Sequence, residues 1–196
     1  MAGEKQGLQL LDFWVSPFAQ RCRIALAEKG LAYESLEQDL ANKGALLLSS
    51  NPIHKKVPVL LHGGRPICES LVILQYLDDA FPDAPALLPS DPHARARQVR
   101  AGPEMVEALR TLEAELGDKE YLAGDAFGFA DLAVVPFAAW FVGYGRLGEF
   151  RAEEVCPRLV AWAERCGERE SVAGNMHPPE KVWEFIGYLK DKYGDK

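Results

Sequence analysis

The chain is poor in the features that mark redox, zinc-binding and membrane-spanning proteins. Its four cysteines stand far apart and none belongs to a CxxC pair, so the sequence indicates neither a redox dithiol nor a zinc knuckle. No apolar run reaches the roughly 18 residues of a membrane-spanning helix. The first residues, MAGEKQGLQLL, lack the apolar block of a secretion signal. We therefore expect a soluble, cytoplasmic protein with reduced thiols and no membrane partner.

Positive charge is also scarce. Lysine and arginine number 22 against 29 aspartates and glutamates, which gives a formal net charge of −7. A nucleic-acid partner would need a basic face, so this balance argues against one. It does not exclude a small anionic ligand held by a few local cations. The 196 residues, 48% of them hydrophobic, are enough for one large domain or two small ones.

The first half of the chain alternates strand-like and helix-like segments. Apolar periodicity and turn residues predict strands over 8–14, 33–39, 57–62 and 65–68. They predict helices over 17–29, 42–50 and 71–81, with Glu69-Ser70 opening the last of them. This order is typical of an α/β sheet packed on helices.

The second half is predicted to be entirely helical. The segment PDAPALLPSDP, residues 82–92, is rich in proline and shows no periodicity, so it is the best candidate for a linker. Beyond it, helices are predicted over 104–116, 130–144, 157–169 and 180–192. The predicted organisation is therefore an α/β domain over 7–86 and an all-α domain over 93–196.

Three stretches carry a resemblance to a known family. They read DFWVSPFAQRCRIALAEKG, NPIHKKVPVLLHGGRPICESLVILQYLDDAFP and CPRLVAWAERC. With the order of the predicted elements, they resemble the soluble glutathione transferases, and among these the plant tau class. The resemblance covers nearly all of the first domain, and the second from about Glu104 onward.

The resemblance implies a fold and a reaction. The first domain is expected to be thioredoxin-like and to bind glutathione. The second is expected to be an all-α domain that forms the pocket for a hydrophobic electrophile. The implied reaction is attack of the glutathione thiolate on that electrophile, as in detoxification. Glutathione is then a co-substrate and no further cofactor or metal is implied. The family also implies a homodimer.

Ser16 lies where the first strand gives way to a helix. Serine directly before Pro17 is typical of a helix N-cap, and this role alone would account for it. A thiol-using enzyme, however, must hold a thiolate near neutral pH, although a free thiol has a pKa of about 8.5. A hydroxyl that donates to the thiolate lowers that pKa, and the helix N-terminus acts in the same direction. By the resemblance, Ser16 is the catalytic residue that stabilises the thiolate.

Basic residues precede the third predicted strand. Two lysines before an apolar strand are often only a solvated edge. By the resemblance, Lys56 and Lys43 meet the glycine carboxylate of glutathione, and charge-assisted hydrogen bonds would suit that role. Val57-Pro58 resembles the cis-proline of the family. A cis bond there would present the Val57 backbone to glutathione as a strand partner, whereas a trans proline would only begin an edge strand.

Glu69 and Ser70 lie at the start of the third predicted helix. An acid and a hydroxyl at this place are by default capping residues. By the resemblance, they bind the γ-glutamyl end of glutathione. Its carboxylate would contact Ser70 and the helix amides, and its ammonium group would lie near Glu69.

The hydrophobic pocket is less well defined by the sequence. Phe18 and Trp162 occupy positions that resemble pocket residues of the family, although an aromatic residue on an apolar helix face often belongs to the core. The chain also departs from the family between Arg100 and Glu104. A helix of roughly 20 residues with its turn, about thirty residues in all, has no counterpart there, so the second domain is shortened.

The shortened domain makes an alternative function worth weighing. A glutathione-dependent carrier of hydrophobic ligands, without efficient turnover, would need only the binding sites. Thiol transfer or dehydroascorbate reduction would need a cysteine at position 16, where this chain has serine. The sequence therefore favours a glutathione transferase, with the carrier as the alternative.

Overall fold

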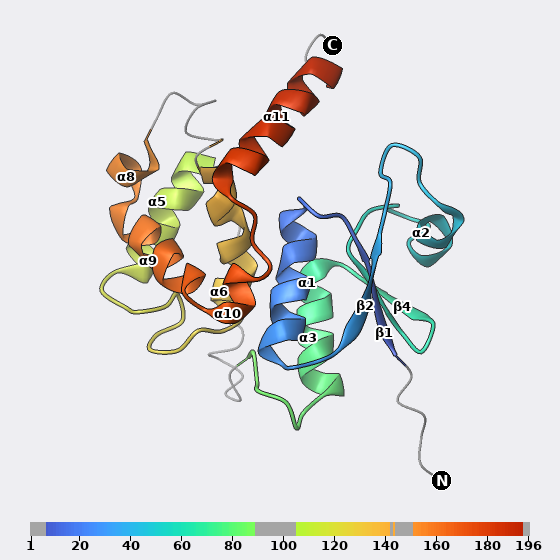
Figure 1. The fold of residues 1–196 in the computed structure, drawn as a ribbon. Helices are drawn as coiled ribbons and strands as arrows, with labels where there is room; N and C mark the ends of the chain where they lie inside the picture. The colour runs from blue at the N-terminus through green and yellow to red at the C-terminus, as the bar shows by residue number, and fades with distance from the viewer. Residues whose placement is uncertain (1–6, 89–104, 142, 144–150, 194–196) are drawn as a thin grey trace. The chain divides into compact units, whose positions relative to one another are not determined.

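The computed structural model describes residues 7–88, 105–141, 143 and 151–193 (Figure 1). The chain divides into two compact units, Met1–Leu88 and Pro89–Lys196. The boundary falls within the proline-rich segment 82–92. The junction at 100–104, where the family helix is expected to be missing, lies outside the described residues.

The first unit is built on a four-stranded sheet with the order β2-β1-β3-β4. Its strands are β1 (Leu8–Asp12), β2 (Tyr33–Glu37), β3 (Val59–His62) and β4 (Arg65–Cys68). β1 pairs in parallel with β2 and antiparallel with β3, which forms a hairpin with β4. Helices α1 (Pro17–Glu28) and α3 (Ser70–Ala80) cover one face of the sheet, and α2 (Ala45–Ser50) lies on the other side (Figure 1).

Both faces of the central strands are largely buried, which explains the adjacent leucines Leu10-Leu11 in β1 and Leu60-Leu61 in β3. Leu11, Val59 and Leu61 pack with Leu47 of α2 on one side. Leu10 of the same strand is fully buried as well. Strands that are covered on two faces read as continuous apolar runs rather than as alternating ones. This arrangement brings the C-terminal end of β1 and the start of α1 to one edge of the unit.

The second unit is helical. Its helices are α5 (Met105–Leu116), α6 (Phe129–Val134), α8 (Ala152–Val155), α9 (Pro157–Gly167), α10 (Glu170–Ala173) and α11 (Pro179–Tyr193). The prediction of one helix over 130–144 is wrong in one respect. A 3-10 turn, η1 (Val135–Phe137), interrupts it at Pro136, which has no N–H to donate to the preceding turn. The short helices α8 and α10 were not predicted.

Two carboxylates, of which that of Asp131 is buried, connect the helices of the second unit. Asp131, fully buried, accepts hydrogen bonds from the Leu122 N–H at 2.9 Å, the Gly128 N–H at 2.9 Å and the Trp162 indole N–H at 2.8 Å. Glu113 of α5 accepts from the first free N–H groups of α9, those of Arg158 (3.0 Å) and Leu159 (2.7 Å). Asp131 therefore has the folding role that its place at the start of α6 indicates.

The observed architecture confirms the predicted fold class, an α/β thioredoxin-like unit followed by an all-α unit. None of the helices in the described ranges combines the length and the apolar character that crossing a bilayer requires.

Candidate functional site

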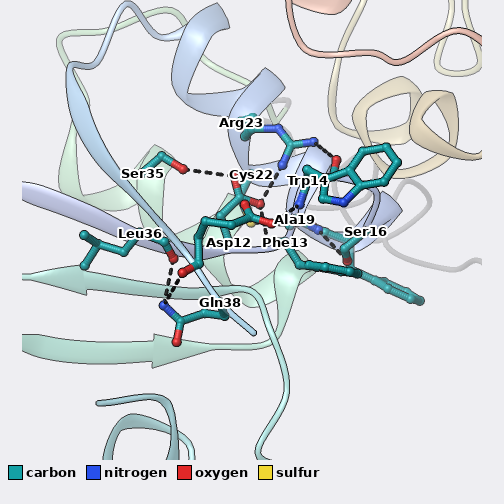
Figure 2. A network of polar contacts seen from close by, with 12 residues as sticks. Asp12, Phe13, Trp14, Ser16, Ala19, Cys22, Arg23, Ser35, Leu36 and Gln38 are labelled. Carbon is teal, nitrogen blue, oxygen red and sulfur yellow. Dashed lines mark hydrogen bonds and ion pairs between the residues drawn. The ribbon is translucent and has the colours of Figure 1, made fainter. Parts of the chain in front are cut away.

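Ser16 is the N-cap of α1. Its backbone is extended (φ −64°, ψ 116°), and its Oγ accepts a hydrogen bond from the Ala19 N–H at 3.3 Å (Figure 2). Pro17 occupies the first helical position, and the Ser16 N–H donates to the Phe13 carbonyl at 2.9 Å. The local sequence explains this geometry, because serine satisfies a free helix N–H and proline fixes the first helical φ.

The Ser16 hydroxyl has a proton to spare. As a cap, the oxygen uses only a lone pair. No acceptor for its O–H is found among the residues that the structure describes. The side chain is only partly buried. The Ser16 hydroxyl lies at a helix N-terminus, where the helix dipole favours negative charge. Chemically, this is a site for an anion that accepts a hydrogen bond.

The segment before β3 presents backbone rather than side chain. The Val57-Pro58 peptide bond is cis. Within the described ranges, neither the N–H nor the C=O of Val57 takes part in a hydrogen bond. Asn51, which is buried, holds the loop in front of it: its Nδ2 donates to the Lys56 carbonyl at 3.1 Å, and its Oδ1 accepts from the His54 N–H at 3.2 Å. The free backbone edge of Val57 can therefore pair with an extended peptide.

Lys43 precedes α2 in the chain, and Lys56 follows α2 and comes directly before Val57. Both side chains are exposed, and in the described part of the chain neither is in an ion pair. Lysine is a mobile, hydrated charge that can follow a carboxylate at the rim of a site. The structure leaves these two lysines available for an anionic ligand.

The start of α3 differs from an ordinary cap. Glu69 has a positive φ of 69°, which is uncommon for a residue with a side chain, and its side chain forms no capping hydrogen bond in the described residues. Ser70 is the first residue of α3 and is largely buried. The Arg21 Nη1 of α1 donates to the Ser70 Oγ at 3.2 Å. Burial lowers the pKa of Arg21 to about 10, so this guanidinium stays positive at neutral pH.

Sequence reasoning missed Arg21 and Asn51. Arg21 lies on α1 and meets α3 across 49 residues of sequence. Asn51 looks like a helix breaker in the sequence, but its side-chain amide orders the Lys56 loop. Nothing in the sequence pattern alone indicates either contact.

The two predicted pocket aromatics differ in exposure. Phe18 of α1 is 47% exposed, with the Arg21 guanidinium 5.2 Å from its ring centroid. Trp162 of α9 is 0% exposed, and its indole N–H donates to Asp131. Phe18 is therefore open to a ligand of the first unit, whereas the position of Trp162 fits the core of the second unit.

The cysteines offer no reactive thiol near Ser16. Cys22 is fully buried on α1, and burial, together with the nearby Asp12 charge, raises the pKa of its thiol far above the usual range. Over the residues that can be described, no three His, Cys, Asp or Glu side chains gather into a metal-binding group. The first unit thus offers a ligand a hydroxyl donor, a free strand edge and local cations.

Comparison with known proteins agrees with this geometry. The family model "Glutathione S-transferase, N-terminal domain" matches residues 10–85, and the model "Glutathione S-transferase, C-terminal domain" matches residues 92–165. A probable glutathione S-transferase of Oryza sativa subsp. japonica is 54% identical over 99% of both chains. A probable glutathione S-transferase of Nicotiana tabacum is 45% identical over 94% of this chain and 96% of its own length.

Solved structures give the same result. A rice glutathione S-transferase crystallised in complex with glutathione aligns with a TM-score of 0.91 and 53% identity, covering 97% of this chain and 99% of that one. A tau-class enzyme of mango, Mangifera indica, aligns with a TM-score of 0.85 and 33% identity, covering 94% and 99%. The alignment with the Oryza sativa relative extends over 230 positions, although this chain has 196 residues, so part of that relative has no counterpart here. The chain belongs to the glutathione S-transferase family and, within it, to the tau class.

Proposed function

We propose that this protein conjugates glutathione to hydrophobic electrophiles and that Ser16 stabilises the reacting thiolate. The sulfur forms a bond to an electrophilic carbon, the leaving group departs with its electron pair, and the thiol proton has already passed to solvent. Each unit by which the pKa of the bound thiol falls stabilises the thiolate by about 1.4 kcal/mol. A hydrogen bond from the Ser16 hydroxyl and the N-terminus of α1 both act in that direction.

The rest of the first unit holds the tripeptide. The free N–H and C=O of Val57 pair with its backbone in the manner of a strand, and Lys43 and Lys56 contact the glycine carboxylate. Ser70 and the first N–H groups of α3 bind the γ-glutamyl carboxylate, and Glu69 binds the ammonium group. The nearby Arg21 keeps this end of the site positive.

The electrophile is proposed to contact Phe18, whose exposed ring offers an apolar surface beside α1. A contact with Trp162 stays a prediction, and its burial gives that contact no support. We assign glutathione binding to residues 7–86 and the shortened hydrophobic-substrate domain to residues 93–196.

The observation that carries the proposal is the Ser16 hydroxyl, which caps α1 through its oxygen while its proton has no acceptor in the described residues. The test is steady-state conjugation of a chromogenic aryl halide. In Ser16→Ala we expect kcat to fall about 10²-fold, while the Kd for glutathione changes less than about threefold. Full turnover in that variant would refute the assignment. Tight binding of a hydrophobic dye by the wild type without any conjugation would favour a carrier.

Three further properties are part of the proposal. Two copies are expected to form a homodimer, and the exposed apolar side chains of Leu46, Leu48 and Ile53 around α2 support a subunit contact there. Light scattering that gives a monomer would contradict it. The protein is expected to act in the cytoplasm and to need no cofactor, so that conjugation persists in a metal chelator.

A further inference from the structure

The turn that presents Ser16 is held by a buried ion pair. We propose that Asp12 and Arg23 are positioning residues that fix the Ser16 hydroxyl where it meets the glutathione sulfur. The inference rests on the proposed function of Ser16. It assigns to the pair a task in the reaction in addition to any share in holding the fold together.

Asp12, the last residue of β1, uses both carboxylate oxygens. Its Oδ1 accepts from the Phe13 N–H at 2.7 Å and from the Arg23 Nη1 at 2.5 Å, and its Oδ2 accepts from the Ser35 Oγ at 3.2 Å (Figure 2). The residue is 3% exposed. Its carboxylate thus joins β1, β2 and α1 at the point where the chain turns toward Ser16.

Arg23 bridges the pair to the turn itself. It follows Ser16 by seven residues, two helical turns, and so lies on the same face of α1. One guanidinium arm binds Asp12, and the other, Nη2, donates to the Trp14 carbonyl at 2.9 Å (Figure 2). A guanidinium has the planar fork that two such acceptors need, whereas an ammonium group does not.

As a result, every polar backbone group of Phe13 and Trp14 is bonded. The Phe13 N–H donates to Asp12, and the Phe13 carbonyl accepts from the Ser16 N–H at 2.9 Å. The Trp14 N–H donates to the Glu37 carboxylate at 3.0 Å, and the Trp14 carbonyl accepts from Arg23. Two hydrogen bonds, both made by Phe13, therefore connect the Asp12 carboxylate to the backbone of Ser16.

A fold-stabilising role alone would not require this arrangement. A buried ion pair is weak support for stability, because apolar residues of similar volume often serve as well. Here the bonds converge on the residues directly before the N-cap. A hydroxyl–sulfur hydrogen bond depends steeply on distance and angle, so a small shift of this turn would weaken it.

The first unit contains a second ion pair, Lys29–Asp78, that serves as a control. Lys29, at the other end of α1, binds Asp78 at 2.8 Å and the Pro85 carbonyl at 2.9 Å. Asp78 in turn accepts from the N–H groups of Leu87 and Leu88. This pair is also buried, with side-chain exposures of 1% and 12%, but it holds the segment that leaves the unit.

The test is the pKa of the glutathione thiol bound to each variant, followed by the ultraviolet absorbance of the thiolate. Arg23→Lys keeps the charge beside Asp12 but cannot reach both acceptors. We expect it to raise the pKa of the bound thiol by about one unit and to lower kcat/KM about tenfold at neutral pH, with an unchanged Kd for glutathione. Lys29→Arg, the control, is expected to leave that pKa unchanged even where it lowers the melting temperature.

The Cys22 thiol and the Tyr33 hydroxyl, which interact electrostatically with Asp12, stay uncharged while the bound thiol is titrated near neutral pH. Burial raises the pKa of the Cys22 thiol and of the Tyr33 hydroxyl. Arg21, the next cation along α1, has its pKa lowered only to about 10.

The double variant with Ser16→Ala separates the effect of the Asp12–Arg23 pair on the thiol pKa from the effect of Ser16 itself. If the pair acts through Ser16, Arg23→Lys adds no further rise of the pKa in the Ser16→Ala background. An additive rise overturns the inference, as does an unchanged pKa in Arg23→Lys. If Ser16→Ala alone leaves the pKa unchanged, it is the proposed function that fails. Should Arg23→Lys not fold, Ser35→Ala, which removes a donor from Asp12, decides instead: a rise of at least about 0.3 unit supports the inference, and no rise overturns it.

Discussion

Removal of the Asp131 carboxylate should strongly destabilise the second unit. Asp131 is fully buried and accepts hydrogen bonds from three groups: the N–H of Leu122, the N–H of Gly128 and the indole N–H of Trp162. Two of the donors lie in the connection between α5 and α6, and the third lies on α9. Asp131→Ala leaves all three without this acceptor.

The magnitude follows from that count. A buried donor left unsatisfied costs about 1–3 kcal/mol, and the costs of neighbours are not additive. We therefore expect Asp131→Ala to lower the free energy of unfolding by about 3–5 kcal/mol, which is a large part of the stability of a typical domain. Asp131→Asn keeps an oxygen for Leu122 and Trp162 but sets an amide N–H₂ against the Gly128 N–H. Its cost should be about 1–2 kcal/mol.

The assay is urea unfolding followed by far-ultraviolet circular dichroism and by tryptophan fluorescence. With a typical slope of about 2 kcal/mol per molar urea, the midpoint for Asp131→Ala should fall by about 2 M. Asp125→Ala, in the same loop but exposed, is the control and should change stability by less than about 0.5 kcal/mol. A loss below about 1 kcal/mol in Asp131→Ala would refute the reasoning.

Three other predictions concern the helix cap, the buried thiols and the cationic rim. Glu113→Gln should lower the unfolding free energy by about 1 kcal/mol, because its amide keeps only one of the two oxygens that accept from α9, and the exposed Glu115→Gln should not; urea midpoints decide this. Burial raises the pKa of Cys166 to about 12, whereas an unfolded thiol ionises near 9.0. The unfolded state therefore binds fewer protons at Cys166 above this lower value, so this group's contribution to stability should fall as pH rises from about 9, by up to about 1.4 kcal/mol per pH unit, and Cys166→Ala should reduce the slope by that amount. Lys56→Gln should raise the KM for glutathione about three- to fivefold with kcat unchanged, whereas Lys55→Gln should not; equal effects in both would contradict a specific contact.

The fold class could be predicted from the sequence because local signals and burial agree. The hairpin strand 65–68 has the predicted bounds, since Gly63 and Gly64 supply the positive φ that its turn requires. The 3-10 turn at Pro136 was missed, because the apolar periodicity continues through it and hides the interruption. Short helices such as α8 carry too few residues for periodicity to show.

The candidate site was only partly predictable. Ser16 is readable as a cap because Ser-Pro at a strand-to-helix corner is a local pattern. Its neighbours Asp12 and Arg23 were not assigned, since their bonds depend on how β1 and α1 pack. Long-range contacts of this kind, like that of Arg21 with Ser70, follow from tertiary structure and leave no periodic signal.

The most direct test separates the two roles of Ser16. Glycine is nearly as good an N-cap as serine, within a few tenths of a kcal/mol, but has no hydroxyl, whereas Ser16→Thr retains the hydroxyl. The measurement is the pKa of enzyme-bound glutathione in the wild type and in both variants. We predict a value at least about one unit below that of the free thiol in the wild type and in Ser16→Thr, and a return toward about 8.5 in Ser16→Gly. An equally low pKa in Ser16→Gly would contradict the claim that this hydroxyl holds the thiolate.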